Sequence, residues 1–483
     1  MPMAHLLING VLREAADGRT FPNVNPATEE SIGVAPDAGR EDADAAIAAA
    51  RHTFDNTTWS QDHQFRAHCL RQLRDGLYAE QENLRQILVQ EAGVPVALTH
   101  SIWLDTILDA VSYWADLATS YPYEVQMSSR ATLAGVTSQR TVLREPIGVV
   151  AAITPWNYPL PLNVFKLAAA LAAGCTAILK PAPDTPWSGT ALGRIIAERT
   201  DIPAGVVNVV TGAAPRLGEV LVQDPRVDMI TFTGSTGVGK RIMAAAADNV
   251  TRVCLELGGK SANIILDDAD LPSLAAQIAG VCAHAGQGCA LTTRLLLPRS
   301  RYDEGLAITQ AAFESLRCGD PSDPDVIVGP VMNATQRDRI LSLIDKGKQE
   351  ARLVVGGGRP GYMPVGFYVE PTLFADVSPD AVIAQEEIFG PVLVVIPYDN
   401  DEDAVRIANN SVFGLSAAVH SPDTGRALSV ARRLRTGTVG INGAVWLAAD
   451  TPFGGYKQSG LGRELGADGF AEFLETKSIA VPG

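Results

Sequence analysis

The spacing of hydrophobic and polar positions changes twice along the first third of the chain. Residues 41–120 contain alanine-rich and amphipathic stretches such as DADAAIAAARHTF, in which apolar residues recur at helical spacing. Residues 123–146 are polar, prone to β structure and poor in helix formers. The pattern predicts a helical region followed by an extended hairpin that is inserted before the next unit.

From residue 147 onwards, short apolar runs alternate with helical segments. The runs lie at residues 147–153, 175–181, 205–212 and 227–235, and the helical segments include Phe165–Ala173, Trp187–Arg199 and Ala214–Val222. A second alternating region follows Gly258, with candidate strands at residues 263–268, 294–298, 392–398, 415–420 and 438–443. Alternation of strands and helices indicates βαβ units and parallel sheets. We therefore expect two α/β domains and an inserted arm.

Composition narrows the class of protein. At 483 residues the chain is long enough for about three domains. The formal net charge of −15, without a run of Lys or Arg, argues against a nucleic-acid-binding surface. The apolar runs fall short of the ~18–20 residues that a membrane span needs, and the N-terminus does not read as a signal peptide. Six scattered cysteines without a C-x-x-C pair fit a reducing cytoplasm better than a disulfide framework or a zinc site. We expect a cytoplasmic protein without a metal, nucleic-acid or membrane partner.

The segment DMITFTGSTGVGKRIM runs from an apolar strand through a glycine-rich turn into a helix. A helix N-terminus offers unpaired N–H groups and a positive dipole end, which suits a pyrophosphate. Gly234, Gly237 and Gly239 follow neither the G-x-G-x-x-G dinucleotide spacing nor the Walker pattern. Taken alone, the segment fits phosphate binding and a plain helix N-cap about equally well.

Two polar residues stand in unusual surroundings. Glu256 lies between two leucines, ahead of a Gly-Gly pair. A carboxylate in apolar surroundings has a raised pKa and can act as a base, although a solvated glutamate at a strand end is the commoner case. Asn157 lies between Trp156 and Tyr158 in a loop bracketed by prolines. A rigidly held amide can donate to an oxyanion, and the commoner use of such an asparagine is to cap a turn.

Cys289 follows Gly286, Gln287 and Gly288, and we interpret the two glycines as keeping the approach to the sulfur open. Free cysteines are more often inert core residues than nucleophiles. The other five fit that description: Cys69, Cys175, Cys254, Cys282 and Cys318. His284 stands five residues away, which is a poor spacing for a helical Cys–His pair, so a cysteine hydrolase is a minor alternative.

These features occur together in the order of a known family. The chain resembles the NAD(P)-dependent aldehyde dehydrogenase superfamily from about residue 8 to its C-terminus. Further matching segments are KPAPDTP (180–186), QEEIFGPVL (385–393), ANNSVFGLSA (408–417) and PFGGYKQSGLGRELG (452–466). The resemblance implies an α/β fold with a Rossmann-like parallel-sheet cofactor domain (1–122 and 147–257) and an α/β catalytic domain (258–458). It also implies a β-arm with the C-terminal tail (123–146 and 459–483) that serves oligomerisation, as a homodimer or homotetramer.

The resemblance assigns roles to the candidate residues. Cys289 would attack the aldehyde carbon, and the Asn157 side chain with the Cys289 N–H would hold the oxyanion. After hydride transfer to the nicotinamide, Glu256 would activate the water that hydrolyses the thioester to a carboxylic acid. The implied cofactor-binding residues are Ile153, Thr154, Trp156, Lys180, Gly234, Ser235, Gly258, Glu387 and Phe389. Lys180 and Ser235 match positions that contact the adenosine ribose and pyrophosphate, and Glu387 matches the carboxylate that binds the nicotinamide ribose.

The chain departs from the family pattern at two places. Pro183 replaces the usual acid three residues after Lys180, which grips the adenosine ribose in NAD-preferring members and repels a 2′-phosphate. No new arginine accompanies the change, so we favour NAD and leave NADP open. His284 and Ala285 stand where many members carry Asn-Gln, whereas Gly286, Gln287 and Cys289 are kept.

The positions that match the family's substrate tunnel are all apolar or aromatic: Tyr158, Leu162, Phe165, Trp446, Leu447 and Phe453. Because none is a cation that would bind a substrate carboxylate, we predict an uncharged aliphatic or aromatic aldehyde. One alternative is a CoA-acylating semialdehyde dehydrogenase on the same fold, against which Glu256 argues because those enzymes generally lack the base. A second is a non-catalytic structural or binding member, for which Cys289, Glu256 and Asn157 would not all be needed.

Overall fold

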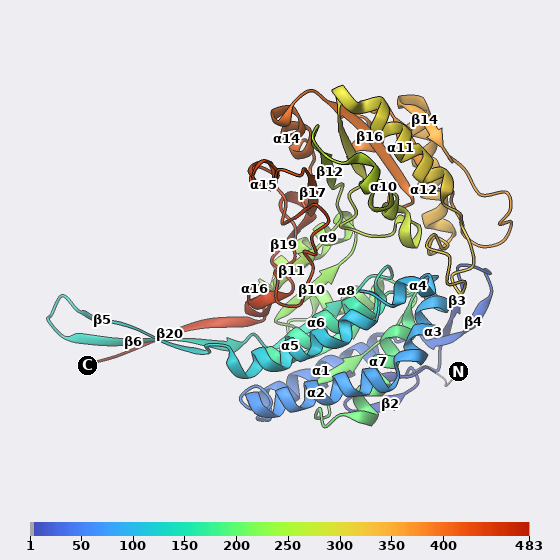
Figure 1. Cartoon of the computed structure of the whole chain (residues 1–483). Helices are drawn as coiled ribbons and strands as arrows, with labels where there is room; N and C mark the ends of the chain where they lie inside the picture. The colour runs from blue at the N-terminus through green and yellow to red at the C-terminus, as the bar shows by residue number, and fades with distance from the viewer. Residues whose placement is uncertain (1–3, 483) are drawn as a thin grey trace.

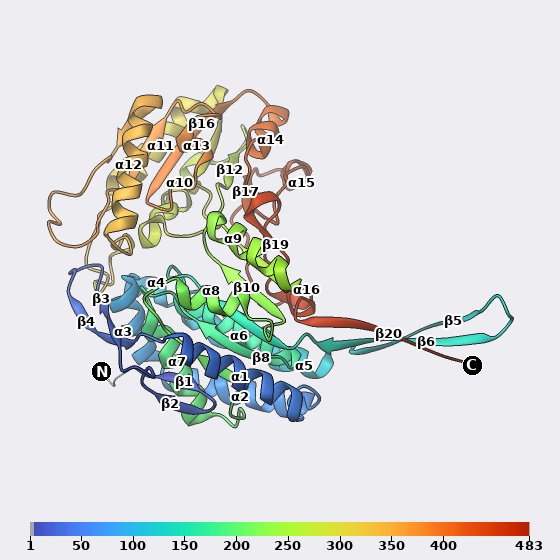
Figure 2. The same cartoon turned by 180° about the vertical axis from the view of Figure 1, so that it is seen from behind.

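The computed structural model describes residues 4–482 and has two halves, each built on one large sheet, with a thin arm that reaches away from the lower half (Figure 1). From behind, the arm leaves the same half, and the N-terminus lies at the opposite side of the body (Figure 2). Each half has one large sheet covered by helices, which makes an α/β fold, as predicted.

The first sheet has the strand order β19-β11-β10-β7-β8-β9-β1-β2. Its strands are β1 (Leu6–Ile8), β2 (Val11–Arg13), β7 (Val149–Ile153), β8 (Thr176–Lys180), β9 (Val207–Val209), β10 (Met229–Thr233), β11 (Arg252–Glu256) and β19 (Gly460–Leu461). The four apolar runs predicted between residues 147 and 235 form β7, β8, β9 and β10, and these strands pair in parallel. That prediction is confirmed. Parallel neighbours need a crossover connection, and the helices between the runs supply it.

The second sheet has the order β14-β15-β16-β13-β12-β17-β18. Its strands are β12 (Ala262–Ile265), β13 (Arg294–Pro298), β14 (Arg352–Val355), β15 (Thr372–Ala375), β16 (Val392–Tyr398), β17 (Ser416–His420) and β18 (Thr438–Ile441). All five strands predicted after Gly258 are present and pair in parallel. The antiparallel edge strand β14 and its neighbour β15 were not predicted.

Residues 41–120 are helical, as predicted, and form α1 (Arg40–Asn56), α2 (His63–Ala79), α3 (Gln81–Ala92), α4 (Val96–Thr99) and α5 (Asp105–Ser120). Further helices accompany the first sheet: α6 (Pro159–Ala173), α7 (Pro186–Arg199), α8 (Arg216–Gln223), α9 (Thr236–Ala246), η1 (Ala247–Asn249) and α16 (Gly466–Ala471). The rest belong to the second half: α10 (Leu271–Ala279), η2 (Gly280–Gly286), η3 (Arg299–Arg301), α11 (Tyr302–Ser315), α12 (Ala334–Glu350), α13 (Val382–Gln385), α14 (Asp401–Asn409), α15 (Thr424–Ala431) and η4 (Lys457–Ser459). No helix among residues 4–482 combines the length and the apolar character needed to cross a membrane.

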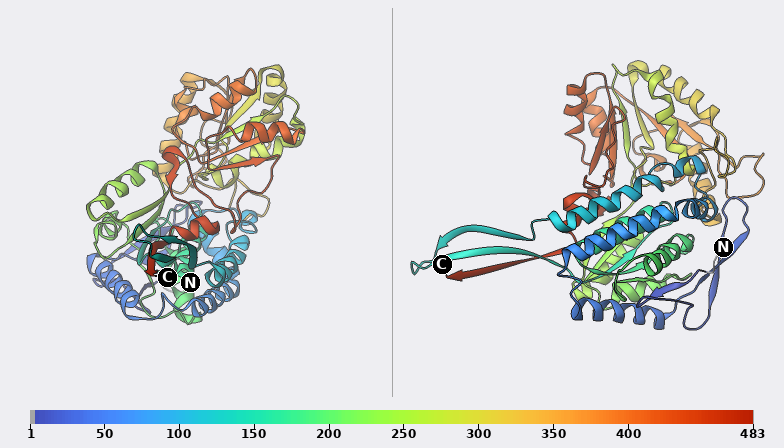
Figure 3. Two further views of the ribbon diagram at one scale, coloured as in Figure 1. Left: turned by 90° about the vertical axis from the view of Figure 1, so that its left-hand side faces the viewer. Right: turned by 60° about the horizontal axis from the view of Figure 1, so that its bottom comes forward.

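The arm is the predicted hairpin, extended by the end of the chain. Strands β5 (Glu124–Ala131) and β6 (Thr137–Pro146) pair antiparallel, and β20 (Leu474–Pro482) adds to β6 (Figure 3). The tail before β20 belongs to the body instead, because β19 pairs with β11 and Phe470 of α16 is fully buried against Trp114. A separate antiparallel pair, β3 (Thr20–Val24) and β4 (Ser31–Pro36), lies near the N-terminus.

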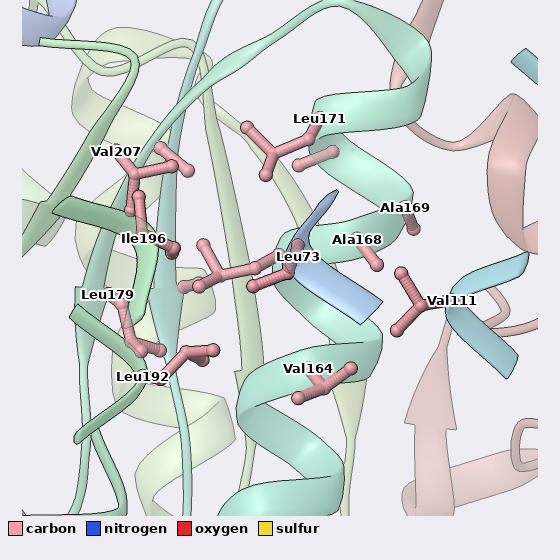
Figure 4. Packing of buried hydrophobic residues seen from close by; sticks show 14 of the residues in the cluster. Leu73, Val111, Val164, Ala168, Ala169, Leu171, Leu179, Leu192, Ile196 and Val207 are labelled. Carbon is pink, nitrogen blue, oxygen red and sulfur yellow. The ribbon is translucent and has the colours of Figure 1, made fainter. Parts of the chain in front are cut away.

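Helix α6 forms the centre of the core beneath the first sheet. Leu171, Ala168 and Val164 on this helix pack with Leu73 of α2 and Val111 of α5 (Figure 4). On the sheet side, Figure 4 shows Leu179 of β8 and Val207 of β9 beside Leu192 and Ile196 of α7. Small alanines on α6 allow its neighbours to approach closely. Helix α6 is therefore packed tightly on both of these sides.

Candidate active site

A cavity of about 400 Å³ lies at the carboxyl ends of β7, β10 and β11, where loops from the second half meet the first sheet. It brings together two of the three predicted catalytic residues, Cys289 and Asn157. Six predicted cofactor residues also line it: Trp156, Gly234, Ser235, Gly258, Glu387 and Phe389. Residues from sequence positions 156 to 389 therefore share one cavity.

The loop that carries Cys289 is anchored by Gln287. The buried Gln287 amide donates to the carbonyls of His284 (3.0 Å) and Pro330 (3.2 Å), and its oxygen accepts from the Met332 N–H (2.8 Å). His284, Ala285 and Gly286 all have positive φ, and a Cβ at Gly286 would collide with the Gly390 carbonyl. Gly286 therefore permits close backbone packing at this point of the loop, and its part in keeping the approach to the sulfur open stays a prediction.

Cys289 is half-buried, and its surroundings disfavour the thiolate. Burial raises the pKa of the Cys289 thiol to about 12, and the Glu387 and Glu256 carboxylates raise it further. The resting thiol is protonated at neutral pH, so a base must remove its proton when it reacts. The Asn157 side chain is buried and donates one amide hydrogen to the Gln287 carbonyl at 3.0 Å. An amide NH₂ has a second hydrogen, which remains available for an oxygen in the cavity.

Glu256 ends β11 and is 2% exposed, so the alternative of a solvated strand-end carboxylate is wrong. Neither of its carboxylate oxygens has a hydrogen-bond partner within residues 4–482. Burial raises the pKa of Glu256 well above its ordinary value, and the neighbouring Glu464 carboxylate adds to the effect. The result is a buried acid that is a strong base once it loses its proton.

Sequence reasoning missed a buried ion pair beside Glu256. The Lys166 ammonium on α6 donates to the Glu464 carboxylate and to Thr231 Oγ1 (3.0 Å), and it is 1% exposed. Its charge lowers the pKa of Glu256, against the effect of burial. One signal was available, since Lys166 is the only charged residue within the apolar segment 159–173. Glu464 lies 298 positions away, and nothing local links the two.

The glutamate at 387 is held by the Gly-Gly pair after Glu256. The Gly259 N–H donates to Glu387 Oε1 at 2.9 Å, and a Cβ at Gly258 would collide with the same carboxylate. Burial raises the pKa of Glu387 to about 7. Beside it, the Trp156 and Phe389 rings meet edge to face with centroids 5.3 Å apart.

The turn at residue 234 leads into a true helix N-terminus. Ser235 is the N-cap of α9, where its hydroxyl accepts from the Val238 N–H at 3.4 Å. The N-terminal end of α9 thus opens on the cavity, which Ser235 lines. The lining residues that sequence reasoning missed include Gln336 and Arg339 of α12. Arg339 donates to the carbonyls of Glu387 (2.7 Å) and Ile388 (2.8 Å), and a contact of this kind leaves no trace in the sequence.

Three predicted cofactor residues are not among the described residues that line the cavity: Ile153, Thr154 and Lys180. They lie at the same sheet edge, where Ile153 pairs in register with Lys180. Thr154 donates to Asn163 Oδ1 at 2.6 Å, and Lys180 Nζ donates to the Pro181 carbonyl at 3.2 Å. Burial lowers the pKa of Lys180 to about 8.

None of the six predicted substrate-tunnel residues belongs to the described lining of the cavity. Four of them, Tyr158, Phe165, Leu447 and Phe453, pack against the core beneath the first sheet. Trp446 stacks on Phe453 with centroids 6.0 Å apart, and Leu162 lies on α6. Tyr158 stacks on Trp103 (4.7 Å), which sequence reasoning did not single out.

Comparison with known proteins gives consistent matches over nearly the whole chain. The sequence model of the Aldehyde dehydrogenase family matches residues 13–479. A geranial dehydrogenase of Castellaniella defragrans is 41% identical over 462 residues, which cover 95% of each chain. The solved structure of a Mycobacterium tuberculosis aldehyde dehydrogenase complexed with NAD+ is 42% identical, with a TM-score of 0.94 over 99% of this chain and 98% of that one. Aldehyde dehydrogenase C of Pseudomonas syringae, complexed with NAD+ and octanal, is 37% identical, with a TM-score of 0.93 over 99% and 96% of the two chains.

Proposed function

The chain belongs to the aldehyde dehydrogenase family, and from this premise we propose that it oxidises an uncharged aliphatic or aromatic aldehyde to the carboxylic acid, with NAD(P) as the cofactor. The observation that carries the proposal is the single cavity that holds Cys289, Asn157, Glu387 and the N-terminal end of α9. A nucleophile, an oxyanion donor, a ribose-binding carboxylate and a phosphate-binding helix end are the parts that this reaction needs.

In the first half of the reaction, Cys289 Sγ forms a bond to the aldehyde carbon, and the carbonyl electron pair moves onto oxygen. The thiol proton leaves to solvent as the bond forms, so that this step does not need Glu256. The free hydrogen of the Asn157 amide and the Cys289 N–H stabilise the oxyanion. Bound NAD supplies the acceptor for the hydride, after which Cys289 carries a thioester.

In the second half, Glu256 first releases its own proton to solvent, and the carboxylate then takes a proton from a water whose oxygen attacks the thioester carbon. The C–S bond then breaks, Cys289 leaves as a thiolate, and the carboxylic acid is released. The Lys166–Glu464 pair supports this step, because the Lys166 charge partly offsets the burial that keeps Glu256 protonated.

The residues around the cavity fit a dinucleotide. Gly258 leaves space where a side chain would displace the Glu387 carboxylate, which is aimed by the Gly259 N–H and free to accept from ribose hydroxyls. Ser235 and the α9 N-terminus suit a pyrophosphate, and Arg339 adds a positive charge. We favour NAD, because two of the related structures contain it and no arginine accompanies Pro183.

An uncharged substrate is supported by the apolar set Tyr158, Phe165, Leu447 and Phe453, which share one cluster. The related proteins named for geranial, or complexed with octanal, involve uncharged aldehydes. The test is an aldehyde panel assayed with NAD and with NADP, followed by the absorbance of the reduced nicotinamide. Oxidation of succinic semialdehyde far faster than of hexanal or benzaldehyde would contradict the proposal.

Three alternatives separate cleanly from it. A CoA-acylating enzyme would form product only in the presence of CoA, and the buried Glu256 speaks against it. A cysteine hydrolase would turn over without a nicotinamide cofactor. A non-catalytic member would show no turnover at all, whereas we expect Cys289→Ala to abolish turnover and leave cofactor binding near normal.

We also propose that the first-sheet half binds the cofactor, that the second half supplies the nucleophile, and that the arm joins copies into a homodimer or homotetramer. The arm supports this because it exposes apolar side chains: Val125, Met127, Leu133, Val136, Ile479 and Val481. The sedimentation of the intact chain, compared with that of a chain lacking residues 474–483, tests whether the arm joins copies.

The six cysteines are all free, which supports a cytoplasmic location.

A further inference from the structure

We propose that Glu91, at the end of α3, is a positioning residue for the adenosine half of the cofactor. Its carboxylate fixes the first turn of α7, and that turn fixes the segment Lys180–Pro181. The inference rests on the proposed function, in which Lys180 contacts the adenosine ribose.

The Glu91 carboxylate is fully buried and is surrounded by donors. Its Oε2 accepts from the Trp187 N–H (2.8 Å) and from Asn23 Nδ2 (3.0 Å), and its Oε1 accepts from the Ser188 N–H (2.8 Å) and from the Ser188 hydroxyl. Two of these donors are free N–H groups in the first turn of α7, where a negative charge is favoured by the helix dipole. A carboxylate of another helix thus caps α7.

This cap is connected to Lys180 through direct packing. Gly189, in the same turn of α7, has no room for a side chain because a Cβ would lie 2.6 Å from Pro181 Cγ. Pro181 in turn accepts through its carbonyl from Lys180 Nζ at 3.2 Å. A shift of the α7 N-terminus therefore displaces Pro181 and, with it, the Lys180 ammonium.

The chemistry of the site requires a carboxylate. A glutamine at 91 has one acceptor oxygen and one NH₂ group, so its NH₂ would face either the Trp187 or the Ser188 N–H, donor against donor. Burial raises the pKa of Glu91 to about 7, while the four donors favour the charged form.

The chain supplies a matched control at the other end of the same two helices. Glu80, at the N-terminal end of α3, accepts from Arg194 (2.8 Å) and Arg199 (2.7 Å) in the last turns of α7. Glu80→Gln removes contacts at the C-terminal end of α7, far from Pro181, whereas Glu91→Gln removes contacts at its N-terminal end, beside Pro181. A merely structural role for Glu91 would make the two variants alike.

The experiment measures the dissociation constant of 5′-AMP by calorimetry, together with KM for NAD and kcat, for the full chain and four variants. Glu91→Gln is expected to raise both the AMP dissociation constant and KM for NAD about ten-fold, as for one lost buried charged hydrogen bond, with kcat within about two-fold of wild type. Ser188→Ala, which removes one donor and keeps the carboxylate, is expected to raise them about two- to three-fold. Glu80→Gln is expected to lower the melting temperature and leave both constants unchanged.

Lys180→Ala distinguishes a failure of the positioning role of Glu91 from a failure of the proposed cofactor site. If Lys180→Ala weakens AMP binding while folded Glu91→Gln and Ser188→Ala bind AMP as wild type does, the positioning role is overturned and the cofactor site stands. If Lys180→Ala leaves AMP binding unchanged, the assignment of the adenosine site fails, and the role of Glu91 fails with it. Should Glu91→Gln not fold, Ser188→Ala decides the matter alone.

Discussion

Replacement of Lys166 by methionine tests the buried ion pair beside the proposed base. The Lys166 and Glu464 side chains are 1% and 8% exposed, so water screens their attraction little. Removal of the ammonium leaves Glu464 beside Glu256 without its cation. Breaking a buried pair in this way costs about 3–5 kcal/mol of folding free energy, because an uncompensated charge stays buried.

The assay is urea unfolding of the wild type, Lys166→Met and the double variant Lys166→Met/Glu464→Gln. The double variant should recover most of the loss, to within about 1 kcal/mol of wild type, because both charges are then absent. Lys166→Met alone should also slow thioester hydrolysis, since the pKa of Glu256 rises further when the Lys166 charge is lost. A destabilisation below about 1 kcal/mol, or a double variant no more stable than the single one, would show that the buried ion pair does not stabilise the fold.

Three further predictions follow from the buried groups around the cavity. Glu256→Gln should stabilise the protein above about pH 5, and increasingly so as the pH rises, because the native state holds a proton on Glu256 that the unfolded chain releases. Melting curves of both proteins between pH 5 and 9 measure this. A difference in melting temperature that does not change with pH would contradict it. The rate at which iodoacetamide alkylates Cys289 should climb about ten-fold per pH unit from pH 7 to 10 without a plateau, because burial raises the pKa of this thiol to about 12; a plateau near pH 8.5 would show an ordinary thiol. Gly258→Ala should raise KM for NAD at least about ten-fold, because the added methyl displaces the Glu387 carboxylate, and steady-state kinetics that match wild type would rule this out.

The sheets could be predicted because each strand is a short apolar run set between helices. The strands β7, β8, β12 and β16 are buried along most of their length, which is why their sequences are nearly uniform in hydrophobicity. The N-terminal strands β3 and β4 gave no such signal. Strand β3 alternates between buried and exposed positions over only five residues, β4 is buried only at its last two residues, and both contain a proline.

The site residues could be predicted only where one short segment of the sequence contains a recognisable motif. Cys289, Asn157 and Glu387 each sit in a recognisable stretch, and the fold brings them to one cavity. Lys166, Glu464 and Glu91 were missed because each owes its character to a partner far away in the sequence, at separations of 298 and 97 residues. Burial and pairing are properties of the folded chain, and a single sequence shows them only indirectly.

We propose that Cys289 carries a thioester whose hydrolysis depends on Glu256. The direct measurement is the intact mass of Glu256→Gln after it is mixed with hexanal and NAD, followed by peptide mapping. We expect a mass increase equal to one acyl group per chain, located on Cys289 and absent when Cys289 is also replaced by alanine. An unmodified Glu256→Gln chain that turns over at the wild-type rate would contradict it.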